Sequence, residues 1–198
     1  MRTIPHWLPN AISALRIALV PVWVLAAEAA NRDGGGHALT VAVLLTIGAS
    51  DVIDGWLARR FGLQSRVGAT LDAVADKLAQ VVLVTWFALR PGPAFESLPL
   101  WFLGLLIARD VSLLTGVLVI RVRAGKVEVE HAAHGKASSV LLFVMLLAFS
   151  AGYGREVTLP LLLLIAGLVA WSTVRYVRVG LRQLRGAVRG AHRHEAAR

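Results

Sequence analysis

Residues 51–76 read DVIDGWLARRFGLQSRVGATLDAVAD and place four aspartates, Asp51, Asp54, Asp72 and Asp76, among apolar residues. Of the 198 residues in the chain, 57% are apolar, whereas an ordinary soluble domain is about half apolar. Charged side chains inside a membrane segment are costly, and they normally mark a function or pair with one another. This stretch therefore predicts a membrane protein with a polar site built from these acids.

Six apolar segments surround and include this stretch, and most have about the 20 residues that cross a bilayer. They are residues 11–30, 38–58, 67–89, 99–120, 136–152 and 157–179. Gly- and Pro-rich breaks separate several of them. The pattern predicts an all-α integral membrane protein with six transmembrane helices around a cytoplasm-facing polar cavity and a basic amphipathic C-terminal extension. We expect one membrane domain over residues 1–180 and a cytoplasmic tail over residues 181–198.

The net charge of +9 is distributed unevenly. Most of the 21 Lys and Arg residues lie at one set of segment ends, namely Arg2, Arg59, Arg60, Arg66, Arg121, Arg123, Lys126, Lys136 and the arginines from Arg175 to Arg198. The opposite loops hold Arg32, Arg90 and Arg155. The positive-inside rule then places both termini in the cytoplasm of a multi-pass protein of the inner cell membrane. Because topology accounts for the basic excess, we expect no nucleic-acid partner.

The tail combines two stripes at helical spacing. Arginines recur at 175, 178, 182, 185 and 189, beside apolar residues at 174, 177, 181, 184 and 188. A helix with a basic and an apolar face is typical of a segment lying on anionic lipid headgroups. The alternative is a frayed, solvated terminus, particularly after Gly190.

The spacing of the four aspartates predicts a cluster. Asp51 and Asp54 are three residues apart near the end of one predicted helix, and Asp72 and Asp76 are four apart near the start of the next, so each pair shares a helix face. A short loop between antiparallel helices would bring both pairs to one depth. Four ionised carboxylates cannot coexist at low dielectric, so either several are protonated or cations bind.

Magnesium suits such a site because it binds through carboxylates together with substrate phosphates. Two ions about 3.5–4 Å apart would use all four acids. Zinc fits less well, because no His or Cys alternates with the acids and the chain has no cysteine.

The residues between the aspartates suit a phosphate ligand. Gly55 and Gly68 would let a ligand approach the backbone, and Ala58 keeps one helix face low. Arg59, one turn after Gly55, offers a guanidinium for a phosphate oxygen. The alternative for the pair Arg59 and Arg60 is a positive-inside signal, which we prefer for Arg60.

These residues complete the pattern D-x2-D-G-x2-A-R-x8-G-x3-D-x3-D, and the stretch resembles the signature of the CDP-alcohol phosphotransferases. The six-segment layout is similar to that family as well. The resemblance implies that a CDP-linked lipid, usually CDP-diacylglycerol, places its diphosphate on Mg²⁺ or Mn²⁺, with two ions bound. An acceptor hydroxyl then attacks the lipid-side phosphorus and CMP leaves.

The resemblance also assigns roles to residues. Asp51, Asp54, Asp72 and Asp76 would be metal ligands, and Asp76 would also be the general base. The positions that would shape the CDP-lipid pocket are Gly55, Ala58, Arg59 and Gly68. A homodimer is implied by the family and is not visible in the residue pattern.

A second resemblance predicts which alcohol is the acceptor. LPNAISALRIALVPV, residues 8–22, resembles the start of phosphatidylglycerophosphate synthases and related cardiolipin synthases, with Asn10, Ser13 and Arg16 as matching polar positions. For glycerol-3-phosphate, the preferred acceptor, a basic subsite would be needed, and the candidates are Arg16, Arg109 and Lys136.

Two departures from these enzymes bear on the choice. Ala73 replaces the usual proline, which affects local helix geometry. Arg109–Asp110 resembles the cardiolipin synthases, in which phosphatidylglycerol is the acceptor, and this reading is the alternative. Inositol phosphate and serine are weaker options.

A cation or proton transporter is the rival from another class, with the aspartates as an ion relay. That reading explains acids within the membrane. It does not explain Gly55, Ala58, Arg59 and Gly68 at their spacings.

Overall fold

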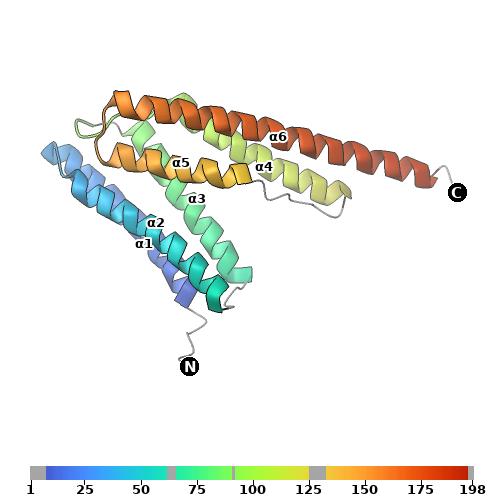
Figure 1. Ribbon diagram of the computed structural model, residues 1–198, viewed down its shortest axis with the longest axis horizontal. Coiled ribbons are helices and arrows are strands. Elements are labelled where there is room, and N and C mark those ends of the chain that lie inside the picture. Colours follow the sequence, from blue (N-terminus) through green and yellow to red (C-terminus); the bar gives the residue numbers. More distant parts are fainter. Residues whose placement is uncertain (1–7, 62–65, 91, 125–132, 196–198) are drawn as a thin grey trace. The chain divides into compact units, whose positions relative to one another are not determined.

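The computed structural model is all-helical and describes residues 8–61, 66–90, 92–124 and 133–195 (Figure 1). Six helices follow one another within these ranges: α1 (Leu8–Asp33), α2 (His37–Phe61), α3 (Arg66–Leu89), α4 (Leu100–Ala124), α5 (Ala133–Ser150) and α6 (Arg155–Glu195). Four of the six predicted apolar segments lie within one of these helices, and the other two, 99–120 and 136–152, extend past α4 and α5 by one and two residues. The six helix assignments are therefore confirmed.

Three of the helices are long and apolar enough to cross a membrane, and their candidate spans are Ala11–Asp33, His37–Leu57 and Arg155–Arg178. The apolar part of α5 that the structure describes, Ser138–Ser150, is shorter. Helices α3 and α4 are interrupted by charge. The helices are thus consistent with a membrane protein, whereas the six-span topology and the direction of the cavity stay predictions.

Helix α6 extends further than its apolar segment. It runs for 41 residues to Glu195, so the helix passes through Gly180 and Gly190 without a break. The predicted helix through residue 189 is therefore confirmed. The side chains after Gly180 lie outside the described residues, and the lipid-facing role of the tail stays a prediction, as does the division at residue 180.

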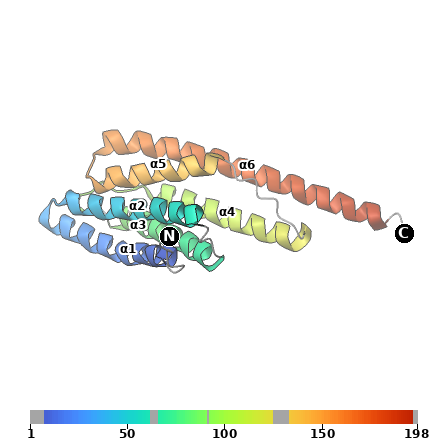
Figure 2. The ribbon, with the colours of Figure 1, turned by 60° about the horizontal axis from the view of Figure 1, so that its bottom comes forward.

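The chain forms two compact units. One contains residues 1–99 and 143–159, and the other contains residues 100–142 and 160–198. In the first unit, α1 packs against both α2 and α3 (Figures 1 and 2). The sequence-predicted acids of α2 and α3 all belong to this unit.

Aromatic packing holds one end of the first unit together. Trp23 of α1 is fully buried and packs edge-on against Trp86 and Phe87 of α3, with ring centroids 5.3 and 5.2 Å apart. Phe149 of α5 lies 5.2 Å from Phe87. The Trp86 indole N–H donates to Glu28 of α1 at 3.1 Å. These contacts fix how α1, α3 and the end of α5 are placed in the unit.

Two glycines with positive φ end helices in this unit. Gly34 (φ 67°) follows α1 and Gly152 (φ 71°) follows α5, the left-handed conformation in which glycine commonly ends a helix. The surroundings differ. A Cβ at Gly34 would meet nothing within 4 Å, whereas one at Gly152 would lie 2.6 Å from Cε1 of His37, whose ring packs on Phe95 at 5.0 Å.

We expect Gly152→Ala to destabilise the protein by about 3 kcal/mol, because about 1–2 kcal/mol of backbone strain adds to an overpacking cost of similar size. Gly34→Ala is the matched control and should show the backbone cost alone. Thermal unfolding in detergent measures both variants. Equal losses would mean that His37 moves aside freely.

Candidate functional site

Three of the four predicted acids come together in the first unit. Helix α2 runs toward the end of the unit at which α3 begins (Figure 1). Asp51 and Asp54 near the end of α2 therefore lie beside Asp72 near the start of α3. One carboxylate oxygen from each of these three residues lies within 4.8 Å of the other two. We refer to Asp51, Asp54 and Asp72 as the acid triad.

The Arg16 guanidinium from α1 lies against all three carboxylates. Its Nη1 is 3.1 Å from Asp51 Oδ1 and 2.9 Å from Asp72 Oδ1, and its Nη2 is 2.9 Å from Asp54 Oδ2. The Ser13 hydroxyl, one turn earlier on α1, donates to Asp54 Oδ2 at 3.2 Å. Helix α1 thus supplies a charge and a hydroxyl to acids carried by α2 and α3.

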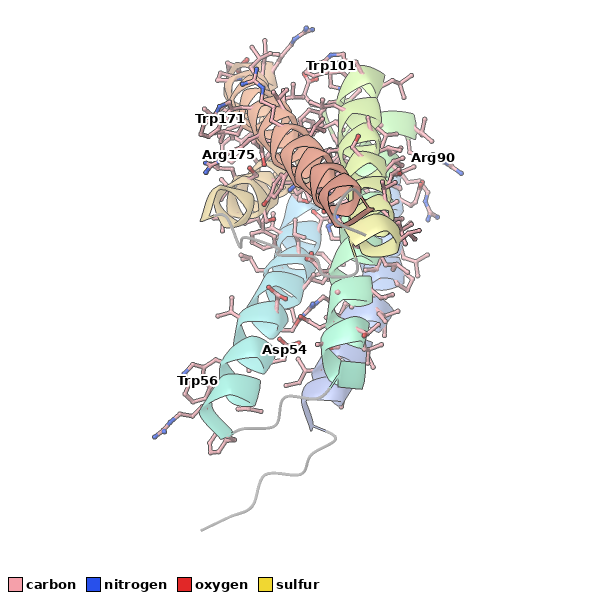
Figure 3. The ribbon with its side chains drawn as sticks, turned by 90° about the vertical axis from the view of Figure 1, so that its right-hand side faces the viewer. Asp54, Trp56, Arg90, Trp101, Trp171 and Arg175 are labelled. Atoms are coloured by element: carbon pink, nitrogen blue, oxygen red, sulfur yellow. The ribbon has the colours of Figure 1, made fainter. Side chains whose placement is uncertain are left out.

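The acid triad has a buried end and an open end. The side chains of Arg16 and Asp54 are 1% and 5% exposed, whereas those of Asp51 and Asp72 are 51% and 43% exposed. Asp54 projects from α2 toward the side on which α3 lies (Figure 3). A cation or a phosphate can therefore reach the triad from the side of Asp51 and Asp72.

Asp76 lies one turn after Asp72 on α3 and is exposed, and it is not a member of the acid triad. The neighbouring Lys77 donates from Nζ to Gln80 Oε1 at 3.2 Å. The predicted cluster of four is thus present as a set of three, with the fourth acid one turn away on the same helix.

The sequence profile of the CDP-alcohol phosphatidyltransferase family matches residues 6–176, which is most of the chain. The chain belongs to this family. All four aspartates, Arg16 and Arg109 lie within the matched range.

Several family relatives are similar in sequence. A cardiolipin synthase (CMP-forming) of Streptomyces coelicolor is 38% identical over 120 residues, which are 58% of this chain and 51% of the relative. A CDP-diacylglycerol–glycerol-3-phosphate 3-phosphatidyltransferase of Pseudomonas fluorescens is 31% identical over 177 residues, 86% of this chain and 88% of the relative. An Arabidopsis thaliana protein named as a second such enzyme is 28% identical over 184 residues, 86% of this chain and 78% of the relative. The chain thus spans about half the length of the cardiolipin synthase and most of the glycerol-3-phosphate enzymes.

The remaining positions of the family motif lie on helices α2 and α3. Gly55 follows Asp54 in α2, Gly68 lies one turn before Asp72 in α3, and both are half-buried. Ala58 and Arg59 belong to α2, but their side chains lie outside the described residues. Gly55 and Gly68 are thus close in sequence to members of the acid triad, and the CDP-lipid pocket stays a prediction at all four positions.

The candidates for acceptor binding are spread over three helices. Arg16 contacts the acid triad, which does not test its predicted acceptor role. Arg109 of α4 is half-buried, and its Nε has no hydrogen-bond partner among the residues that the structure describes. It lies in the second unit. The side chain of Lys136 in α5 is outside the described residues. The acceptor subsite stays a prediction.

The sequence interpretation missed the contacts of Ser13 and Arg16 with the acids. A signal was present, because the two residues are three apart on one helix face and an arginine inside an apolar segment needs a partner of opposite charge. Spacing alone could not show which acids would supply it.

The donor set of the acid triad fits a hard divalent cation. It offers carboxylate oxygens, which Mg²⁺ and Mn²⁺ prefer, and two of the three carboxylates face solvent. One arginine offsets one of the three negative charges, which leaves an excess that a divalent cation can neutralise.

Proposed function

We propose that this chain transfers a phosphatidyl group from CDP-diacylglycerol to an alcohol acceptor in phospholipid biosynthesis, with glycerol-3-phosphate as the acceptor and release of CMP. The observation that carries the proposal is the complete family motif on α2 and α3, whose acids Asp51, Asp54 and Asp72 gather at the end of the unit. The similarity to two glycerol-3-phosphate enzymes over 86% of this chain supports this acceptor.

The proposed chemistry assigns each acid a role. Asp51, Asp54 and Asp72 would hold two Mg²⁺ or Mn²⁺ ions together with Asp76. When bound, these ions would neutralise charge developing on the phosphoryl oxygens of the substrate. Asp76 would accept the proton of the acceptor hydroxyl as its oxygen bonds to the lipid-side phosphorus. The bond from that phosphorus to the bridging oxygen breaks, and CMP leaves with that oxygen.

The motif glycines and Arg59 would bind the donor. Gly55 and Gly68 would let a diphosphate approach the backbone, and Arg59 would pair with one of its oxygens. Arg16, Arg109 and Lys136 are the proposed basic residues for the acceptor phosphate. The transporter alternative assigns these motif positions no role, so we do not retain it.

The proposed placement is a six-span protein of the inner cell membrane, with both termini in the cytoplasm and the acids near the cytoplasmic surface. The charge distribution supports this orientation, since Arg59, Arg60 and Arg66 lie at the same helix ends as the acid triad. A nucleotide from water and a lipid from the bilayer would meet there. A homodimer and the lipid-surface role of residues 181–198 belong to the same proposal.

A second acceptor has specific support. The cardiolipin synthase of S. coelicolor is more similar per residue, and Arg109–Asp110 resembles those enzymes. Phosphatidylglycerol is therefore the alternative acceptor.

An acceptor panel distinguishes these proposals. Purified protein in detergent with Mg²⁺ and CDP-diacylglycerol is supplied with glycerol-3-phosphate, phosphatidylglycerol, inositol phosphate or serine, and lipid products are identified by mass. We expect glycerol-3-phosphate to give product at least about tenfold faster than the others. Cardiolipin as the main product would favour phosphatidylglycerol as the acceptor. If none of the four acceptors supports metal-dependent release of CMP, the proposed activity itself is wrong.

A further inference from the structure

The Arg16 guanidinium occupies the centre of the acid triad. Nη1 is shared between Asp51 and Asp72, the two exposed acids, and Nη2 pairs with the buried Asp54. Arginine stays protonated in proteins, so this charge is permanent. The oxygens that would ligate a divalent cation are therefore already in contact with a cation that belongs to the chain.

One nitrogen of the Arg16 guanidinium makes no hydrogen bond to the residues that the structure describes. This nitrogen, Nε, is buried. A buried donor without a partner raises the free energy of the arrangement. The guanidinium is thus held by its two Nη atoms, both of which point at carboxylates.

Charge makes the two cations competitors. Three carboxylates and one guanidinium leave two negative charges, which is the charge of one divalent ion. A divalent ion that approaches Asp51 and Asp72 from solvent meets the positive Nη1 at the same oxygens. Repulsion between cations a few ångströms apart is substantial in a partly buried site.

We propose that Arg16 is a built-in counter-ion of the acid triad, which holds the three carboxylates together before metal arrives and competes with the metal for Asp51 and Asp72. The inference rests on the proposed metal site and deepens it. The proposal predicts two effects in opposite directions: removal of Arg16 lowers the stability of the metal-free protein and raises its affinity for the metal. Removal of a purely structural arginine would lower both the stability and the affinity.

The test compares Arg16→Gln with wild type by thermal unfolding in detergent while Mg²⁺ is titrated without substrate. The metal-free unfolding temperature should fall, and the Mg²⁺ concentration at half-maximal stabilisation should fall about tenfold. Arg60→Gln is the matched control, because it removes the same charge from an exposed position on α2, six residues after Asp54. Its Mg²⁺ midpoint should stay within about twofold of wild type.

Direct binding gives a second readout. Titration with Mn²⁺, followed by loss of the EPR signal of the free ion, should rank the variants in the same order without unfolding. Arg16→Lys keeps the charge but has one nitrogen and cannot bridge three acids, so its affinity should lie between those of wild type and Arg16→Gln. If Arg16→Gln does not fold, Arg16→Lys is compared with wild type instead.

Unchanged or weaker metal binding by Arg16→Gln, or by Arg16→Lys where the first variant does not fold, would overturn the inference while leaving the proposed metal site intact. If wild type binds neither Mg²⁺ nor Mn²⁺ in either experiment, the metal site itself fails, and the counter-ion role falls with it.

Discussion

Replacement of Asp76 by asparagine is expected to reduce turnover by about 10³-fold, because the variant loses the group proposed to accept the proton of the acceptor hydroxyl. Asp76 is exposed on α3 and lies outside the acid triad. The substitution should therefore leave folding nearly unchanged. CMP release from CDP-diacylglycerol with Mg²⁺ and glycerol-3-phosphate measures the effect.

The matched control is Asp33→Asn, which makes the same chemical change at an exposed position at the end of α1. Its turnover should stay within about twofold of wild type. Asp76→Glu tests the chemistry in the other direction, since it keeps a carboxylate at a shifted position and should retain more activity than Asp76→Asn. CMP release by Asp76→Asn at the wild-type rate with every acceptor of the panel would refute the role of base.

Asp54→Asn is expected to have two effects at once. Loss of a proposed ligand should lower turnover at least about 100-fold and raise the Mg²⁺ requirement. Loss of the buried partner of Arg16 should also destabilise the metal-free protein by about 2 kcal/mol, less than for a fully broken buried pair because Asp51 and Asp72 still contact the guanidinium. CMP release against Mg²⁺ concentration and thermal unfolding without metal measure the two effects separately.

Asp51→Asn separates ligand loss from stability loss. Its side chain is half exposed, and exposed ion pairs contribute only about 0–1 kcal/mol. We expect a lower turnover and a higher Mg²⁺ requirement, with a metal-free stability within about 1 kcal/mol of wild type. Equal destabilisation by Asp51→Asn and Asp54→Asn would contradict the difference between the open and buried ends, and an unchanged metal requirement in both would contradict their ligand roles.

The acid cluster could be predicted from sequence because it depends on residues that are close together along the chain. Asp51 and Asp54 share a helix face, as do Asp72 and Asp76, and one short connection brings the pairs together. Spacing could not show that Asp76 stands apart from the other three. Asp76 lies about 6 Å further along the same face of α3 than Asp72, so which of the two acids meets Asp51 and Asp54 depends on the axial position of α3 relative to α2, which tertiary packing decides.

The partners of Arg16 could not be predicted in this way. Arg16 and Asp72 are 56 positions apart in sequence, and their contact depends on how α1 packs against α2 and α3. An isolated arginine in an apolar segment predicts that a partner exists, but it is equally compatible with a substrate phosphate. The interpretation of Arg16 as an acceptor residue relied on resemblance, which suggests what a residue binds and does not show its contacts inside the protein.

Some helix ends could be predicted from sequence more closely than others. Helices α1 and α5 end just before Gly34 and Gly152, at Asp33 and Ser150, which is three residues after and two residues before the predicted ends of their apolar segments. The end of α6 could not be read from hydropathy, because the apolar run stops near residue 179 while the helix continues to Glu195. Helix propensity and membrane insertion are separate properties, and arginine is a good helix former.

The aromatic packing around Trp23 and Trp86 lies well away from the acids, since Trp86 is about 20 Å along α3 from Asp72 at 1.5 Å per residue. One end of the unit is thus joined by apolar contacts that need no ligand, and the other contains like charges that repel one another. Selection can act on the two ends separately. Mutations that raise thermostability can accumulate around Trp23 without cost to catalysis, whereas the charged end could gain stability only if the acids and Arg16 were all replaced by well-packed apolar residues, which would give up the site.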